Sequence, residues 1–106
     1  MLKRVRRRYL ALEIDAEEVI SLEEFIGAVW NAISRLYGEY GASRAGLTLI
    51  DYDADKRFAV IRVAHRSLEM VRTALASIIK VGNKPVAIHV FTVSGTIKSL
   101  YKKMAK

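Results

Sequence analysis

One short apolar stretch near the C-terminal end constrains the fold of this chain more than any other. Residues 86–93 are rich in Val, Ile, Phe and Thr, follow the only proline, Pro85, and run into Ser94 and Gly95. This composition and length favour a β-strand over a helix. Alternate residues of a strand lie on opposite faces, and both sets are mainly apolar here. We therefore expect a strand that is covered by the chain's own helices on one face and by a partner on the other.

Three further stretches predict strands, and two predict helices. Residues 8–14 alternate as a half-buried strand, and residues 47–53 and 57–63 are expected to pair as a hairpin. Ser21 and Glu24 match a capping box, so a first helix should begin there and end at Gly38 or Gly41.

A second helix is expected to be capped by Ser67, to run through Ile79 and to end at Gly82 and Asn83. The order β-α-β-β-α-β predicts an α+β protein with the ferredoxin-like or RRM-like split βαβ fold. Its four-stranded antiparallel sheet has strands one and three in the centre and two helices on one face. A short helix at the C-terminus could dock on the other face.

The length of 106 residues allows one domain and no second one. We expect a single RRM-like domain over residues 1–106, with a basic N-terminal arm at 1–8 and a lysine-rich C-terminal helix at 96–106.

The net charge of +7 comes from the two ends of the chain. Residues 1–8 carry +5 and the residues after 95 carry +4, whereas nine Lys/Arg face eleven Asp/Glu in between. This segregation is typical of termini that bind a polyanion, with nucleic acid and an anionic membrane as candidates and solubility alone as the alternative. No apolar run approaches the ~20 residues of a membrane span. We expect a cytoplasmic protein with no membrane partner.

Arginine and lysine side chains suit the phosphate oxygens and the shape of folded RNA. The terminal cluster is the strongest candidate for this contact, and basic residues nearer the sheet would extend it. The candidate RNA-binding residues are Lys3, Arg4, Arg6, Arg7, Arg8, Arg44, Arg62, Lys98 and Lys102, and Arg66 could extend the patch.

The third strand carries only part of the signature of an RNA-binding RRM sheet. Phe58 occupies the first aromatic position, but Val60 and Val63 replace the other two, and Tyr9 could stand beside Phe58. Because base stacking needs aromatic faces, we do not expect this sheet to bind RNA in that way. A protein partner or the C-terminal helix fits this face better. The expected partner surface consists of Tyr9, Phe58, Val60 and Phe91.

No set of residues indicates protein-borne catalysis or metal binding. The chain has no cysteine, and neither His65 nor His89 has a triad partner at a suggestive spacing. Residues 51–55 resemble the start of a calcium loop, but Lys56 and Arg62 occupy the positions that need glycine and glutamate. A hairpin turn is the better interpretation. We expect no catalytic residue, metal ligand or cofactor in the protein itself.

Three short motifs resemble the small RRM-like protein subunit of archaeal and eukaryotic ribonuclease P (the Pop5 family) and of its relative RNase MRP. They are Arg8, Tyr9 and Leu10 at the start of the first strand, residues 41–46 before the second, and residues 94–98 at the end of the last. The resemblance covers nearly the whole chain, and the compact length is similar to that of archaeal members.

The resemblance implies a non-catalytic subunit of an endoribonuclease that removes the 5′ leader from precursor tRNA. In that family the RNA carries the active site and its Mg²⁺, and the protein pairs with a TIM-barrel-like subunit. Precursor tRNA would then be an indirect partner. The resemblance marks Arg8 and the turn from Gly95 to Lys98 as functional positions.

Two other functions stay open from the sequence. An acylphosphatase-like small hydrolase would need an anion-binding loop after the first strand, but residues 15–18 are acidic there. A regulatory or dimerisation module of ferredoxin-like fold would bind no RNA at physiological salt. Self-association as a homodimer is also left open.

Overall fold

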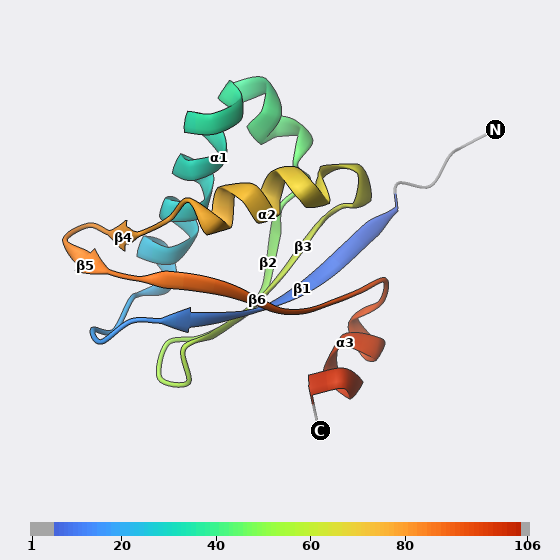
Figure 1. The fold of residues 1–106 in the computed structure, drawn as a ribbon. Helices are drawn as coiled ribbons and strands as arrows, with labels where there is room; N and C mark the ends of the chain where they lie inside the picture. The colour runs from blue at the N-terminus through green and yellow to red at the C-terminus, as the bar shows by residue number, and fades with distance from the viewer. Residues whose placement is uncertain (1–5, 105–106) are drawn as a thin grey trace.

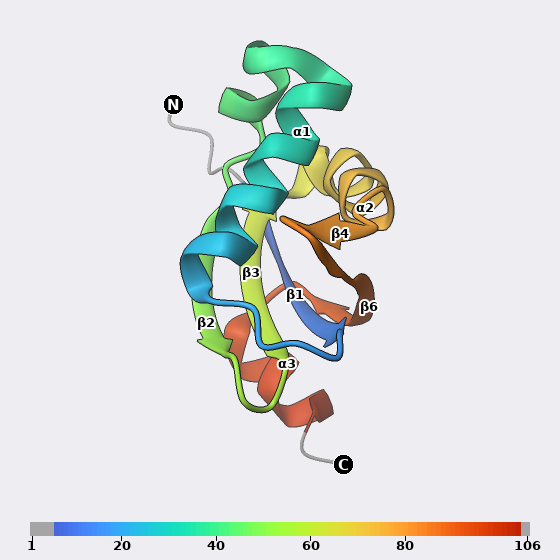
Figure 2. The same ribbon diagram turned by 90° about the vertical axis from the view of Figure 1, so that its left-hand side faces the viewer.

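The structure, a computed structural model, describes residues 6–104. Its centre is an antiparallel sheet of four strands in the order β2-β3-β1-β6. Helices α1 and α2 cover one face, and the short helix α3 lies on the other face (Figures 1 and 2). The predicted α+β fold with strands one and three in the centre is confirmed. The elements of the sheet and its helices are β1 (Arg7–Asp15), α1 (Leu22–Arg44), β2 (Thr48–Asp53), β3 (Phe58–Ala64), α2 (Leu68–Ala76), β6 (Ala87–Ser94) and α3 (Ile97–Met104).

The main core lies between the sheet and helices α1 and α2. Leu10 and Leu12 of β1 and Ile61 of β3 are fully buried on this face. They pack in one cluster with Phe25 of α1 and Leu75 of α2. Burying each such side chain stabilises the fold by roughly 1.5–3 kcal/mol, so this layer fixes the positions of all four strands.

Helix α1 begins where the capping box predicts and ends later than expected. Ser21 Oγ accepts a hydrogen bond from the Glu24 amide at 3.1 Å, and the Glu24 carboxylate accepts one from the Ser21 amide at 3.0 Å. Gly38 leaves the helical conformation, with φ of 73° and ψ of 178°, but the helix resumes and ends at Arg44. Gly38 therefore redirects the helix instead of ending it. Gly41 is buried, and a Cβ there would lie 2.5 Å from Tyr37 Cβ, so the position has no room for a side chain.

The second helix is shorter than predicted and is followed by a small hairpin. A 3-10 turn, η1 (His65–Ser67), precedes α2, and Ser67 Oγ donates to the Arg44 carbonyl instead of capping α2. The helix stops at Ala76, and β4 (Lys80–Val81) pairs with β5 (Lys84–Pro85). Gly82, with φ of 61°, lies in the turn of this hairpin. The prediction that the helix extends through Ile79 is wrong, and Ile79 is 74% exposed.

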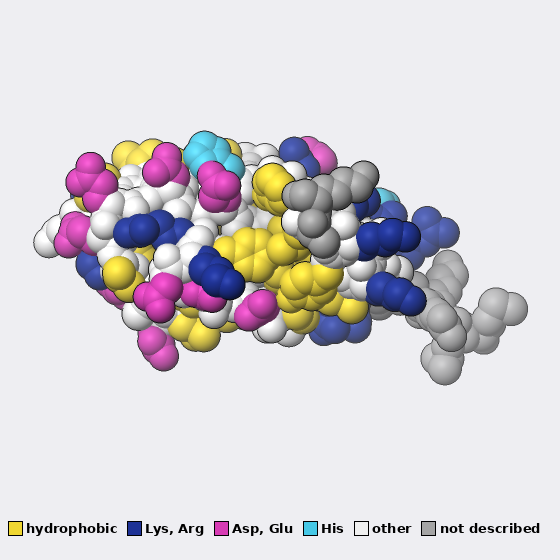
Figure 3. All heavy atoms as spheres, turned by 90° about the horizontal axis from the view of Figure 1, so that it is seen from below, with side chains coloured by type: hydrophobic (Ala, Val, Ile, Leu, Met, Phe, Trp, Pro, Cys, Tyr) yellow, Lys and Arg dark blue, Asp and Glu magenta, His cyan; other side chains and the backbone are white. Residues whose placement is uncertain are grey.

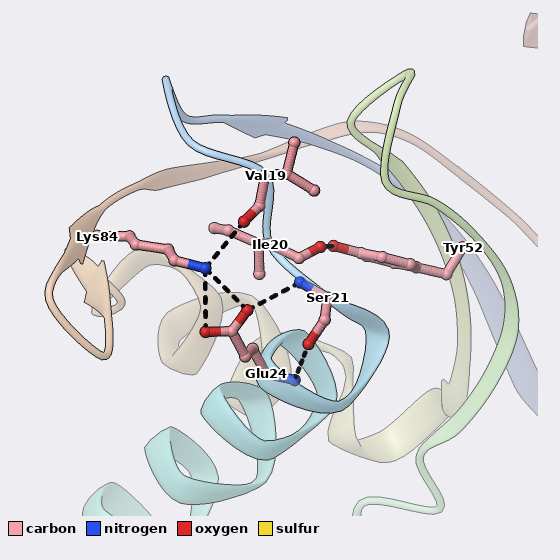
Figure 4. A network of polar contacts seen from close by, with 6 residues as sticks. All are labelled: Val19, Ile20, Ser21, Glu24, Tyr52 and Lys84. Atoms are coloured by element: carbon pink, nitrogen blue, oxygen red, sulfur yellow. Dashed lines mark hydrogen bonds and ion pairs between the residues drawn. The ribbon is translucent and has the colours of Figure 1, made fainter.

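A polar network attaches this hairpin to the start of α1 (Figure 4). Lys84 Nζ lies 3.0 Å from Glu24 Oε1 and also donates to the Val19 carbonyl at 2.9 Å. The Tyr52 hydroxyl donates to the Ile20 carbonyl and so fastens the same loop to β2. The hydrogen bond from the Ser21 amide and the contact with Lys84 hold the pKa of Glu24 below its ordinary value.

Helix α3 closes the sheet face opposite α1 and α2. Leu100 is fully buried in a separate small cluster with Ala11 and Val60. Tyr9, Phe58, Ile97 and Met104 pack around it and are partly buried. The sequence left two possibilities for this face, a protein partner and the C-terminal helix. In the structure, the C-terminal helix covers it.

The remaining local predictions have mixed outcomes. The Asp53 carboxylate accepts a hydrogen bond from the Lys56 amide at 3.0 Å, so the acidic segment forms a hairpin turn as expected. Tyr9 does not stand beside Phe58, because Tyr9 pairs with Arg62 whereas Phe58 pairs with Glu13. In residues 6–104, no helix is long and apolar enough to cross a membrane.

The Glu24 network makes stability depend on pH. Because the pKa of Glu24 is lowered on folding, its contribution is present above the unfolded value of about 4.3 and is lost as the pH falls through the folded value. We expect Glu24→Gln to lower the free energy of unfolding at pH 7, and this difference from the wild type to shrink below pH 4. Urea denaturation at both pH values measures it. Glu23→Gln, an exposed neighbour in the same helical turn, is the control; an equal loss there at pH 7 would contradict the assignment.

The docking of α3 depends mainly on one side chain. Leu100→Ala should lower the free energy of unfolding by about 2 kcal/mol, the low end for a buried leucine, because α3 packs on only a small cluster. Hydrogen exchange should then accelerate in α3 while the amides of β1 and β3 keep their protection. Lys102→Ala, on the exposed side of the helix, should change neither quantity. Unchanged exchange in α3 of the Leu100 variant would show that other contacts hold the helix.

Candidate nucleic-acid interface

The fold brings the two basic segments of the chain to one end of the sheet. Strand β1 is antiparallel to β6, and Tyr9 pairs with Ser94. The start of the first strand therefore lies beside the end of the last, and α3 follows directly. In Figure 3, Lys and Arg gather at the end of the molecule near both termini, while Asp and Glu lie mainly over the other parts of this face. The predicted residues Lys3 and Arg4 lie outside the described residues.

The two motifs at opposite ends of the sequence meet at Arg8 and Gly95. Arg8 Nη1 lies 3.6 Å from the position that a Cβ on Gly95 would occupy, and it donates to the Arg7 carbonyl at 3.1 Å. Arg8 is half-buried, whereas Arg6 and Arg7 are exposed. Because glycine has no side chain, the guanidinium can lie against the turn that leads into α3.

The start of α3 adds positive potential to this end. Thr96 Oγ1 accepts a hydrogen bond from the Ser99 amide at 3.1 Å, and the first turn of the helix contains no acidic residue. Lys98 and Lys102 are exposed, whereas Lys103 donates to the Val93 carbonyl at 3.1 Å and helps to hold the helix. At the start of the helix, the positive end of the dipole and Lys98 therefore act with the same sign, whereas Lys102 and Lys103 lie in the last turn.

The turn η1 also lies at this end of the sheet; Arg66 in it was expected to extend the basic patch, but His65 was not predicted as part of the site. The His65 amide donates to the Arg6 carbonyl at 2.7 Å, which places η1, with exposed His65 and Arg66, beside Arg6. The sequence could have placed His65 near the start of β1, since His65 follows β3 and β3 was expected to pair with β1. It was missed because a single histidine at a strand end carries no pattern of its own.

Arg44 and Arg62 are less free than predicted. The Arg44 guanidinium bonds to the Tyr40 hydroxyl and lies 5.2 Å from the centre of the Tyr40 ring. Arg62 is half-buried and donates to Thr48 Oγ1 at 3.3 Å, and its Nε has no hydrogen-bond partner among the described residues. Both side chains would have to rearrange in part to bind phosphate.

The comparisons with known proteins agree with this geometry. The family model for the Rpp14/Pop5 family matches residues 8–105, which include both Arg8 and the turn at Gly95. This chain belongs to the Rpp14/Pop5 family. The resemblance predicted from the short motifs is thereby confirmed.

Two relatives support this assignment, and one solved structure shares the fold. "Ribonuclease P protein component 2" of Methanobrevibacter smithii is 33% identical over 110 residues, covering 97% of this chain and 92% of the relative. The protein of the same name from Pyrococcus abyssi is 33% identical over 100 residues, covering 94% and 85%. A chain in the cryo-EM structure of yeast Ribonuclease MRP shares the fold, with a TM-score of 0.74 at 18% identity, covering 99% of this chain and 93% of that one.

The predicted partner surface is mostly closed in this member of the family. Val60 is fully buried under α3, which corrects its place in an exposed surface, and Tyr9 and Phe58 are half-buried. Phe91 remains 61% exposed, because a bulge in β6 makes it the extra residue between Val90 and Thr92.

The C-terminal helix is also fastened to β2 by a hydrogen bond to a carboxylate. The Tyr101 hydroxyl donates to Asp51 Oδ2 at 3.4 Å. Burial, and then the charge of Asp51, raise the pKa of Tyr101, which keeps the hydroxyl a donor. Within residues 6–104 there is no cluster of three or more His, Asp or Glu that could hold a metal ion.

Proposed function

We propose that this chain is a protein component of ribonuclease P that supports the catalytic RNA in removing the 5′ leader from precursor tRNA. The observation that carries the proposal is the contact between Arg8 and the turn at Gly95 that leads into α3, in a chain of the Rpp14/Pop5 family. The relatives named ribonuclease P protein component 2 support it further. As a member of this ribonucleoprotein the chain would work in the cytoplasm.

RNA binding would take place through phosphates and helix shape. Helix α3 covers most of the face on which RRM sheets stack bases, and Val60 offers no aromatic ring there. The exposed cations at the end of the sheet fit the negative backbone of folded RNA, which is recognised largely by shape. The exposed residues proposed for this contact are Arg6, Arg7, His65, Arg66, Lys98 and Lys102.

The chemistry would belong to the RNA and its Mg²⁺. The protein would act by screening phosphate charge, which helps the RNA fold compactly and raises the occupancy of its metal sites. In this proposal the protein also binds a TIM-barrel-like ribonuclease P subunit and contacts precursor tRNA only indirectly. It contributes no catalytic residue of its own.

Reversing the charge of α3 tests the RNA interface. The double variant Lys98→Glu and Lys102→Glu should lower the affinity for ribonuclease P RNA at least about tenfold and should reduce the salt slope by about two, since two phosphate contacts are lost. Lys56→Glu with Lys80→Glu carries the same change of charge away from this end and should have a much smaller effect. Filter binding over a series of salt concentrations measures both quantities. Equal losses in the two variants would show that only net charge matters.

Reconstitution tests the role in catalysis. Adding the protein with its TIM-barrel-like partner to ribonuclease P RNA should lower the Mg²⁺ concentration needed for cleavage of precursor tRNA, because protein cations replace part of the required counterions. Cleavage assays over a range of Mg²⁺ concentrations measure this shift, and the Lys98 and Lys102 double variant should show less of it. An unchanged Mg²⁺ requirement with the wild-type protein would overturn the proposed function.

A further inference from the structure

The end of α1, residues 39–44, follows a kink in the helix (Figures 1 and 2). The kink lies at Gly38, whose φ of 73° and ψ of 178° form a conformation that residues with a side chain rarely adopt. Beyond the kink, Gly41 is buried, and the Arg44 carbonyl accepts a hydrogen bond from Ser67 Oγ at 3.0 Å. This last segment of α1 is therefore fastened to the rest of the fold.

Tyr40 projects from this fastened segment into solvent. Its side chain is 72% exposed, more than that of any other aromatic residue in the chain. Arg44 Nη1 donates to its hydroxyl, and the guanidinium carbon lies over the ring, 5.2 Å from the ring centre. This cation–π contact restricts the orientation of the ring, which lowers the entropy lost when a ligand binds to it. Arg44 lies over one face of the ring and leaves the other face available.

Two further segments lie beside the end of α1. The Ala64 amide donates to the Ala45 carbonyl at 3.0 Å, directly after the helix. The next amide, that of His65, donates to the Arg6 carbonyl at 2.7 Å. The end of α1, the turn η1 and the start of β1 therefore form one continuous row at the surface.

This row is strongly positive. Residues 6–8, 39–45 and 65–67 contain five arginines and a single acid, Glu39. Glu69, in the first turn of α2, is the next acid after η1. A row of this sign attracts a polyanion, whereas an apolar protein segment would have to remove these charges from water. The charge around Tyr40 therefore favours nucleic acid over a protein as the ligand of the ring.

An exposed aromatic ring beside cations is the arrangement that binds single-stranded nucleic acid. One base stacks on the ring, while the phosphates on either side contact the cations. The bases of a duplex are already stacked on one another, so the ring can take only an unpaired base. The sheet face on which RRM proteins stack bases is mostly covered by α3 here, and Tyr40 offers such a surface elsewhere on the molecule.

We propose that Tyr40 is a stacking platform for one unpaired base of a bound RNA, with Arg6 and Arg66 holding the neighbouring phosphates. Arg44 is a positioning residue in this site, because it orients the ring instead of binding phosphate. The inference rests on the proposed function for the identity of the RNA, and it adds a single-stranded loop or bulge to the helical surface contacted by the basic end. Because every base has an aromatic face, the site selects unpaired RNA without selecting a sequence.

Tyr40→Leu is the sharpest test, because leucine is apolar and favours a helix but has no aromatic face. Its affinity for single-stranded oligoadenylate of about ten nucleotides should fall about tenfold, as expected for one lost stacking contact. The salt slope should stay that of the wild type, because no phosphate contact is lost. Tyr40→Phe keeps the ring and should bind within about threefold of the wild type. Fluorescence anisotropy over a series of salt concentrations, with a labelled oligonucleotide and the full chain, measures both quantities.

A strand without bases separates stacking from every other effect of the substitution. An abasic oligonucleotide of the same length keeps the phosphates, so the wild type and Tyr40→Leu should bind it equally. The two proteins should also bind an RNA duplex equally, because its bases are not free to stack. If Tyr40→Leu lost the same affinity for the abasic strand as for oligoadenylate, the ring would not contact a base, and the inference would be overturned.

Tryptophan at the same position gives a direct signal of stacking. In Tyr40→Trp, the fluorescence of the added indole should be quenched when oligoadenylate binds, since stacking brings the base against the ring. Phe91→Trp places an indole at another exposed aromatic position, on β6, and should show little quenching. Quenching in Phe91→Trp with none in Tyr40→Trp would place the base on the edge strand and refute the proposal.

Stability and partner binding distinguish the remaining outcomes. Tyr40→Leu should melt within about 3 °C of the wild type, as an exposed substitution does. If it kept its affinity for single-stranded RNA and lost that for a protein subunit, the ring would belong to a protein contact, and the inference would fail.

The inference and the proposed function fail under different results. If the wild type did not bind oligoadenylate, the stacking site would be refuted, while the proposed function would still be judged on ribonuclease P RNA and the lysine variants. An unchanged Mg²⁺ requirement for cleavage, with intact binding of oligoadenylate through Tyr40, would overturn the proposed function alone.

Discussion

The antiparallel pairing of β1 with β6 is the constraint on which the rest of the molecule depends. It places Tyr9 opposite Ser94 and so brings together two basic segments that lie at opposite ends of the sequence. Like charges held within a Debye length of about 8 Å repel each other, so this arrangement opposes folding unless an anion compensates it. The sheet can hold it because β1 also pairs with β3 and because the apolar layer under α1 and α2 fixes both strands. The strand pairing and the apolar core therefore offset the repulsion between the positive charges that they bring together.

The sequence predicted those features that depend on local chemistry. The capping box at Ser21 and the hairpin turn at Asp53 each reflect neighbours within a few residues, and both are present, whereas the half-buried alternation expected of β1 is not, because α3 also buries Ala11 on the second face. The sequence-based predictions were wrong where contacts between residues far apart in the chain decide the local structure. Ile78 and Ile79 fit a helical stripe, but the chain leaves the helix after Ala76 and forms the β4–β5 hairpin, which Lys84 ties to Glu24 some sixty residues earlier. The offset between Tyr9 and Phe58 was unpredictable for the same reason, because strand register is set by long-range pairing.

The site shows the same division. Arg8 and Gly95 were identified as separate positions, and the order of the strands was enough to expect them at one end of the sheet. Arg44 and Arg62 are less available to an RNA than predicted, because they donate hydrogen bonds to Tyr40 and Thr48. A count of charges along the sequence does not show such contacts. The apolar groove between α1 and residues 77–82 had no sequence signal at all. It exists because α2 ends early and leaves Ile79 exposed across from Gly27. The early end of α2 depends on tertiary contacts that the sequence pattern does not show.

Closure of the sheet by α3 changes how such a fold can recognise RNA. An open RRM sheet reads unpaired bases by stacking, which gives sequence preference, whereas cations at the end of a sheet read phosphate positions, which carry no sequence information directly. Specificity for one RNA must then come from its shape and from the geometry in which the protein presents its charges. In the proposed function, such a protein needs a rigid arrangement of its charges more than it needs a reactive group.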